Sequence, residues 1–102
     1  MKIMELLHEH IGEELEDACK YIRLALEYKE SDPETAQMFY KLSTEEMGHM
    51  EALHKSVVSH MEAYKRQKGE PPEGMKALYE FLHRKEIEKA EKIGNLQYLY
   101  RK

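Results

Sequence analysis

Cysteine is nearly absent from this chain of 102 residues, which contains only Cys19. A single cysteine cannot form a disulfide within the chain, and it cannot build the multi-thiolate sites that hold structural zinc. Any metal site would therefore need carboxylate and imidazole ligands. Long apolar runs and a signal-peptide pattern are also lacking, so we expect a cytoplasmic protein with no membrane-spanning segment.

Charge of one sign is not concentrated anywhere along the chain. Lysine and arginine number 16, aspartate and glutamate number 20, and the formal net charge is -4. Nucleic-acid and membrane surfaces are typically bound by clustered basic residues, whereas here both signs are interleaved. We therefore expect neither nucleic acid nor membrane as a partner.

Glycine and proline are scarce, at 5 and 3 residues, and no stretch alternates polar and β-branched residues. Charged residues make up 35% of the chain, and apolar residues recur at spacings of three and four, which indicates long amphipathic helices rather than sheet. This pattern predicts an all-α fold. The predicted helices cover about residues 3–30, 33–67 and 75–102.

Two short segments separate these helices. In "SDPE", residues 31–34, Asp32 is a suitable N-cap and Pro33 suits the first helical position, so the connection is tight and the helices form an antiparallel hairpin. The second break, "KGEPPEG" at 68–74, has adjacent prolines that a helix cannot contain. The chain thus divides into a helical hairpin (1–67), a linker (68–74) and a C-terminal helix (75–102).

The lengths of the hairpin helices predict self-association. At about 1.5 Å per residue they would be roughly 40 and 50 Å long, too extended for three helices to bury their apolar faces well alone. We therefore expect a homo-oligomer, a dimer or a larger assembly.

Four Glu-x-x-His pairs occur, and helical periodicity separates one from the rest. Counting about 100° per residue, Glu46 lies at the middle of an apolar stripe, with His49 about 60° to one side. In the other three pairs the glutamate points away from its apolar face, so we interpret them as ordinary surface pairs. They are Glu5/His8, Glu51/His54 and Glu80/His83.

A second carboxylate also points inward, because Glu14 borders the apolar stripe of the first helix. In a hairpin that turns near residue 32, Glu14 comes level with about residue 50, close to Glu46 and His49. A buried carboxylate needs a partner, either a Lys or Arg of a neighbouring helix or a metal ion. No basic residue is evident on the inward faces at that level, so we favour a metal site.

Three ligands are few for a metal site inside a helical bundle. A second copy of the chain, related by a two-fold axis, would double the number of ligands. Two copies of Glu14, Glu46 and His49 give four carboxylates and two imidazoles, the ligand set of a di-iron carboxylate centre. Such ligands suit iron, two ions per dimer, with manganese or zinc as alternatives. On this hypothesis the same three residues are both the metal ligands and the catalytic residues.

The segments "EELEDACKY" (13–21) and "EEMGHM" (45–50) resemble the ferritin-like superfamily, specifically the short half-ferritins: encapsulated-ferritin-like and small rubrerythrin-like proteins. The resemblance covers about residues 3–65. It implies a four-helix bundle formed by dimerisation, with a ferroxidase site across the dimer interface. The residues matching the metal ligands are Glu14, Glu46 and His49.

The same resemblance assigns roles to three flanking residues. Tyr21 matches an aromatic residue near the site, while Glu13 and Glu16 match acidic residues that line an iron entry path.

The chain also departs from these families. It ends in "LQYLYRK" on a predicted helix rather than in an apolar targeting peptide, which argues against encapsulation in a shell protein. It lacks the four cysteines of a rubredoxin module. The helix over 75–102 has no counterpart in the minimal half-ferritin, and Glu86 on its apolar face is either a further ligand or half of a salt bridge.

The sequence thus leaves three possibilities open. The first is an iron-binding oxidoreductase, a ferroxidase that oxidises Fe(II) with dioxygen. The alternative is a non-enzymatic helical assembly or adaptor protein whose metal site is structural or vestigial. A third possibility is a four-helix partner-binding module with no metal, for which Glu46→Leu should stabilise the fold.

Overall fold

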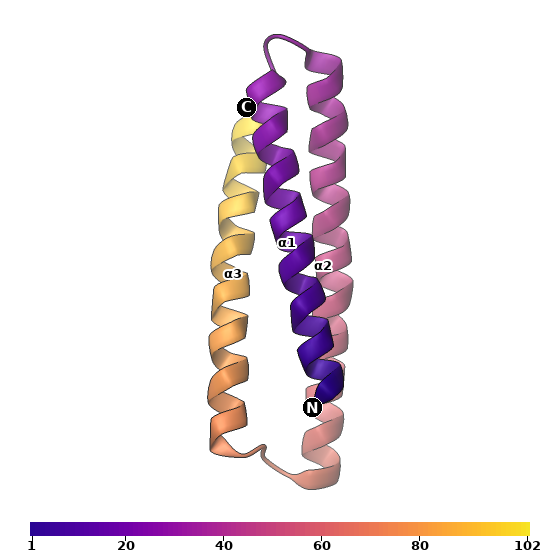
Figure 1. Ribbon diagram of the computed structural model, residues 1–102, viewed down its shortest axis with the longest axis vertical. Helices are drawn as coiled ribbons and strands as arrows, with labels where there is room; N and C mark the ends of the chain where they lie inside the picture. The colour runs from indigo at the N-terminus through magenta and orange to yellow at the C-terminus, as the bar shows by residue number, and fades with distance from the viewer.

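The computed structural model describes residues 1–102 as three helices without strands, which confirms the all-α prediction. The helices are α1 (Lys2–Tyr28), α2 (Pro33–Lys68) and α3 (Glu73–Arg101), each within two residues of its predicted bounds. They lie side by side in an elongated molecule of 55 × 19 × 18 Å (Figure 1). None of them combines the length and the apolar character needed to cross a membrane.

A tight turn joins α1 to α2 and makes them antiparallel (Figure 1). The side chain of Asp32 caps α2, since its Oδ1 accepts a hydrogen bond of 3.2 Å from the backbone N–H of Thr35. This hydrogen bond lowers the pKa of Asp32. Pro33 occupies the first turn, where its missing N–H costs nothing. The N-cap and the hairpin turn are as the sequence predicts.

The connection between α2 and α3 depends on one glycine and two prolines. Gly69 ends α2 with φ 80°, a left-handed conformation that only glycine adopts without strain, and its N–H bonds to the carbonyl of Lys65 at 2.9 Å. Pro71 and Pro72 then prevent the helix from continuing, and α3 starts at Glu73.

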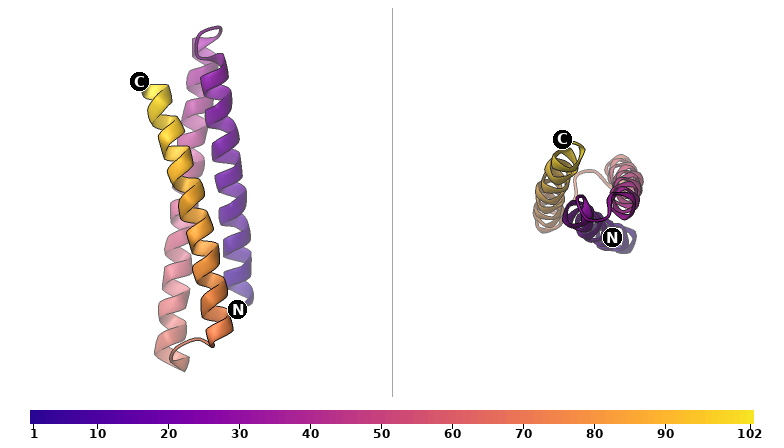
Figure 2. Two further views of the ribbon diagram at one scale, coloured as in Figure 1. Left: turned by 90° about the vertical axis from the view of Figure 1, so that its left-hand side faces the viewer. Right: turned by 90° about the horizontal axis from the view of Figure 1, so that it is seen from above.

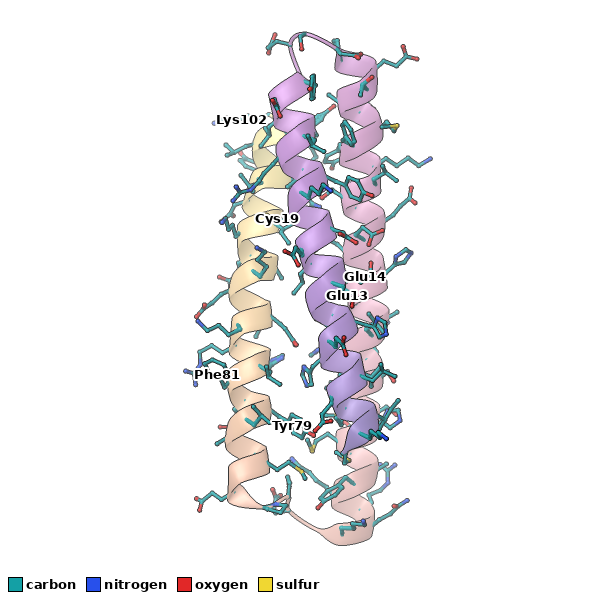
Figure 3. The ribbon with its side chains drawn as sticks, in the orientation of Figure 1. Glu13, Glu14, Cys19, Tyr79, Phe81 and Lys102 are labelled. Atoms are coloured by element: carbon teal, nitrogen blue, oxygen red, sulfur yellow. The ribbon has the colours of Figure 1, made fainter.

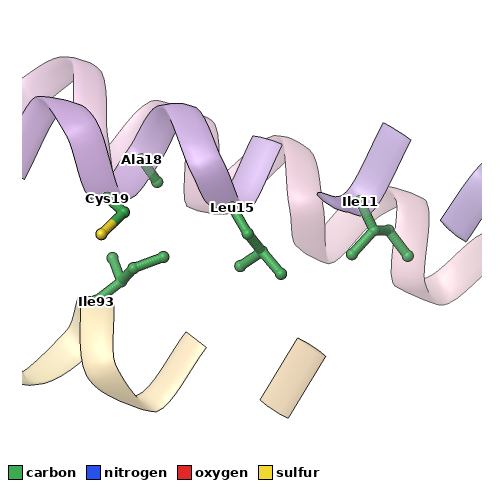
Figure 4. Close-up of a cluster of buried hydrophobic side chains, with 5 residues drawn as sticks. All are labelled: Ile11, Leu15, Ala18, Cys19 and Ile93. Carbon is green, nitrogen blue, oxygen red and sulfur yellow. The ribbon is translucent and has the colours of Figure 1, made fainter. Parts of the chain in front are cut away.

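Helix α1 forms the centre of the core. It has nine buried residues, whereas α2 has only Ala36 and Ser43 and α3 has three. Helix α3 is inclined to the hairpin and packs mainly on α1 (Figure 2). Figure 4 shows Ile93 of α3 pointing toward Cys19 of α1, within a cluster that also includes Ile11, Leu15 and Ala18.

The apolar faces of α2 and α3 are only partly covered. On α2 the apolar stripe is half-buried throughout, since all of its members remain partly accessible: Phe39, Leu42, Met50, Leu53, Val57, Met61 and Tyr64. Near the start of α3, Leu78 is half exposed and the neighbouring Tyr79 is buried. The physical reason is that α3 leans on α1 and leaves much of α2 uncovered.

One buried polar contact joins all three helices. The Ser43 hydroxyl of α2 is fully buried and donates a 2.7 Å hydrogen bond to the Ala18 carbonyl of α1. It also accepts a 3.0 Å hydrogen bond from the Gln97 side-chain amide of α3. The buried hydroxyl thus has a hydrogen-bond partner on each of the other two helices.

Replacing Ser43 with alanine should destabilise the fold by about 1–2 kcal/mol, because Gln97 loses its buried acceptor. Urea unfolding at one fixed protein concentration measures this. Ser59→Ala, at an exposed position of the same helix, is the control and should change stability little. Equal stability of the two variants would contradict the role given to Ser43.

Candidate metal centre

Glu14, Glu46 and His49 come together midway along the hairpin. Glu14 lies on the side of α1 that faces α2 (Figure 3), and Glu46 and His49 are one turn apart on α2. The Nδ1 atom of His49 is 3.4 Å from Oε2 of Glu14 and 3.8 Å from Oε1 of Glu46. One ligand atom from each residue lies within 4.8 Å of the others. The structure therefore brings together the three residues singled out in the sequence.

The two carboxylates are sheltered and the imidazole is open. The exposed fraction is 24% for the Glu14 side chain and 19% for Glu46, but 63% for His49. One Glu14 oxygen, Oε2, is inaccessible to solvent and has no hydrogen-bond partner. In this cluster the two carboxylates are thus largely buried between the helices, and the histidine lies at the surface.

The proximity of the two carboxyl groups changes their titration. A hydrogen bond with Glu14, burial, and the negative charge of Glu14 raise the pKa of Glu46 to about 7, while His49 opposes the rise. The main physical cause is that a protonated Glu46 can share a hydrogen bond with the Glu14 carboxylate, whereas two ionised carboxylates partly shielded from water would repel each other. Without a cation, the pair therefore holds a proton near neutral pH.

No lysine or arginine neutralises this pair. Each of the four ion pairs in the structure has a histidine as its basic partner, and two of them are those of His49 with Glu14 and Glu46. A Lys or Arg partner for Glu46, the alternative considered from sequence, is thus not observed. The donor set fits a hard divalent ion, since two carboxylates and one imidazole suit iron or manganese, and the buried Glu14 Oε2 lies 3.4 Å from Nδ1 of His49.

The flanking residues lie in different settings. Tyr21 is half-buried and stacks on Phe39 with ring centroids 6.2 Å apart. Glu13 is exposed and sits 3.1 Å from Nδ1 of His10, and Glu16 is exposed as well. Their part in an iron entry path stays a prediction.

Glu86 does not join the cluster. Its Oε2 lies 2.6 Å from Nδ1 of His8, so the salt-bridge alternative describes its contact. This contact also corrects the interpretation of His8 as part of a surface pair, because its side chain is only 6% exposed. The signal was available: His8 is four residues after Met4 and three before Ile11, on the buried stripe of α1.

Comparison of the chain with protein-family models, curated proteins and solved structures finds no match. The resemblance to the ferritin-like superfamily therefore stays a prediction, supported by the two motifs of the hairpin.

The raised pKa of Glu46 predicts how the metal-free protein responds to pH. Between pH 4.5, the ordinary value, and about pH 7 the unfolded carboxyl ionises while the folded one keeps its proton, so stability falls as pH rises. Thermal melting with chelator should show a larger drop between pH 5 and pH 8 for the native chain than for Glu46→Gln. Glu45→Gln, at the exposed neighbour, should keep the native drop. An equal drop in both variants would contradict the coupling to Glu14.

Proposed function

We propose that this chain is an iron-binding, ferritin-like ferroxidase whose di-iron site is formed across a homodimer interface. Glu14, Glu46 and His49 of both copies hold two Fe(II) ions while dioxygen oxidises them. The observation that carries this proposal is the pair of sheltered carboxylates with no lysine or arginine beside them.

Charge compensation supports a cation at this place. Two carboxylates removed from water cost several kcal/mol unless a positive group offsets them, and a neutral imidazole does so poorly. A divalent ion supplies two positive charges and accepts lone pairs from all three side chains at once. A bound cation would therefore explain why these three side chains lie together, which packing alone does not explain.

The accessible surface favours a second copy. The chain exposes 6958 Å², whereas a compact monomer of its 12.1 kDa mass would expose about 6,000 Å². The excess is near the 800 Å² or so that each partner buries in a standard interface. The half-buried apolar stripe of α2, which carries Glu46, offers an apolar surface for a partner.

The open side of the cluster is where that partner would approach. The side chain of His49 is 63% exposed, so its imidazole is accessible to a second copy of the chain. Three ligands from each chain would complete the six that a di-iron carboxylate site uses.

The protein's part in the reaction is to bind and to position. Fe(II) is the substrate: two ions would each give one electron to a single dioxygen molecule, which takes up two protons from water and leaves as hydrogen peroxide, while both ions become Fe(III). The Glu14 and Glu46 carboxylates hold the negative charge that stabilises the more highly charged product, and Glu46 releases its proton when a cation takes its place. His49 contributes a neutral nitrogen at the rim, where the ion enters.

Aerobic titration with Fe(II) tests this function. The native protein should oxidise Fe(II) faster than buffer does, with saturation near one iron per chain. Glu46→Ala should reduce the initial rate at least tenfold, because the ion loses a negatively charged ligand.

Glu45→Ala is the matched control, since Glu45 is the exposed neighbour on the same helix and should keep the native rate. Oxidation no faster than in buffer would end the enzymatic proposal, and stabilisation of the fold by Glu46→Leu would then favour a partner-binding helical module with no metal. Retention of the native rate by Glu46→Ala would refute the assignment of the site.

A further inference from the structure

Asp17 of α1 is an acidic residue next to the candidate metal centre, although it is not one of the three proposed ligands. It comes three residues after Glu14 and four before Tyr21. Both of these neighbours touch α2, since Glu14 lies beside His49 and Tyr21 stacks on Phe39. Residues three and four apart lie on the same side of a helix. Asp17 therefore belongs to the part of the α1 surface that borders α2 at the cluster.

The Asp17 side chain is close enough to act on the cluster. Side chains of an α-helix lean toward its N-terminus, so that of Asp17 leans toward the turn that carries Glu14. The pKa of Glu46 is raised first by its hydrogen bond with Glu14 and by burial, and the negative charge of Asp17 adds to the rise. Asp17 is not among the three residues whose ligand atoms lie within 4.8 Å of one another. It is thus a neighbour of the cluster rather than a member.

The carboxylate of Asp17 is accessible and unpaired. The residue is exposed, and none of the four ion pairs of the structure includes it. No basic side chain therefore competes with a cation for its oxygens at ion-pair distance. A hard divalent cation can be held by one or two carboxylates while it keeps several water ligands. Asp17 can thus bind an ion that is still hydrated.

Two other glutamates of this part of α1 are placed differently. Glu13 is engaged with a histidine, since its Oε2 lies 3.1 Å from Nδ1 of His10. Glu16 lines a small cavity between α1 and α3, so it lies on the side of α1 that faces α3. At about 100° per residue, Glu16 is roughly 160° around the helix from Glu14, whereas Asp17 is roughly 60° away. Asp17 is therefore the one that is both beside the cluster and free of a partner.

We propose that Asp17 is the entry residue of the candidate metal centre: its carboxylate binds a hydrated divalent cation and passes it to Glu14 and Glu46. The ion moves from one surface carboxylate to two sheltered ones, which hold it more tightly, so Asp17 becomes free for the next ion. With Fe(II) as the cation this inference rests on the proposed function, and it names the place where the substrate enters. The entry of other divalent cations does not depend on oxidation.

A negative charge at the entrance acts mainly on the rate of binding. Such a charge attracts a cation over several ångströms, which raises the association rate, and dissolved salt screens the attraction. Asp17→Asn keeps the size of the side chain and removes the charge. We therefore expect this variant to bind the same number of ions as the native chain, but about fivefold more slowly at low ionic strength.

Stopped-flow mixing of the metal-depleted protein with Co²⁺ tests the entry role. The chain has seven tyrosines and no tryptophan, so binding can be followed by the quenching of tyrosine fluorescence. The phase that belongs to the centre is the one that Glu46→Ala abolishes. Asp17→Asn should slow this phase at low ionic strength, and the difference from the native chain should shrink as salt is added.

Glu16→Gln is the matched control, because it removes one negative charge from the other side of the same helix turn. It should keep the native association rate. A native rate in Asp17→Asn, or equal slowing in both variants, would overturn the proposal. Loss of bound Co²⁺ at saturation in Asp17→Asn would overturn it as well, since Asp17 would then be a permanent ligand.

Aerobic oxidation of Fe(II) gives a second, separate readout. Asp17→Asn should raise the KM for Fe(II) and leave kcat unchanged, because the ligands of the bound ion are intact. A native chain that does not oxidise Fe(II) would refute the proposed function, whereas the Co²⁺ experiment would still decide the role of Asp17. A lower kcat at native KM in Asp17→Asn would contradict an entry role.

Discussion

The pairing of Glu14 with Glu46 is the constraint on which the account of this protein depends. The turn at Asp32 and Pro33 makes α1 and α2 antiparallel and brings two acidic side chains to the same height, partly out of water. Nothing basic stands beside them except His49. Such a pair is unfavourable in a metal-free chain, where a shared proton relieves the repulsion, and favourable once a cation occupies the space between the carboxylates.

The uneven burial of the three helices links the same cluster to dimerisation. Helix α1 is surrounded, whereas α2 keeps a half-buried apolar stripe and α3 covers mainly α1. On the same helix as the half-buried stripe, the side chain of His49 is 63% exposed. Association through that side would bury the stripe and double the ligand set in one step, so the proposed dimer and the proposed metal site support each other physically.

The helices and the hairpin cluster could be predicted because their signals are local and strong. Asp32, Pro33 and the two prolines before Glu73 define the breaks, and the register of an antiparallel hairpin follows from where it turns. The buried face of α3 could not be predicted in detail, because it depends on how the helix leans against α1, where Tyr79 is buried and Leu78 is half exposed. Ser43 and His8 were missed because polar side chains on a helix are usually solvated, and only tertiary contacts reveal their buried partners.

Anomalous scattering at the iron edge, from crystals prepared anaerobically with Fe(II), shows directly whether the hairpin binds iron. We expect density for iron bound by Glu14, Glu46 and His49, with the same three residues of a second copy completing a pair of ions about a two-fold axis. Carboxylates turned into solvent, or bound to a lysine or arginine with no iron between them, would contradict it.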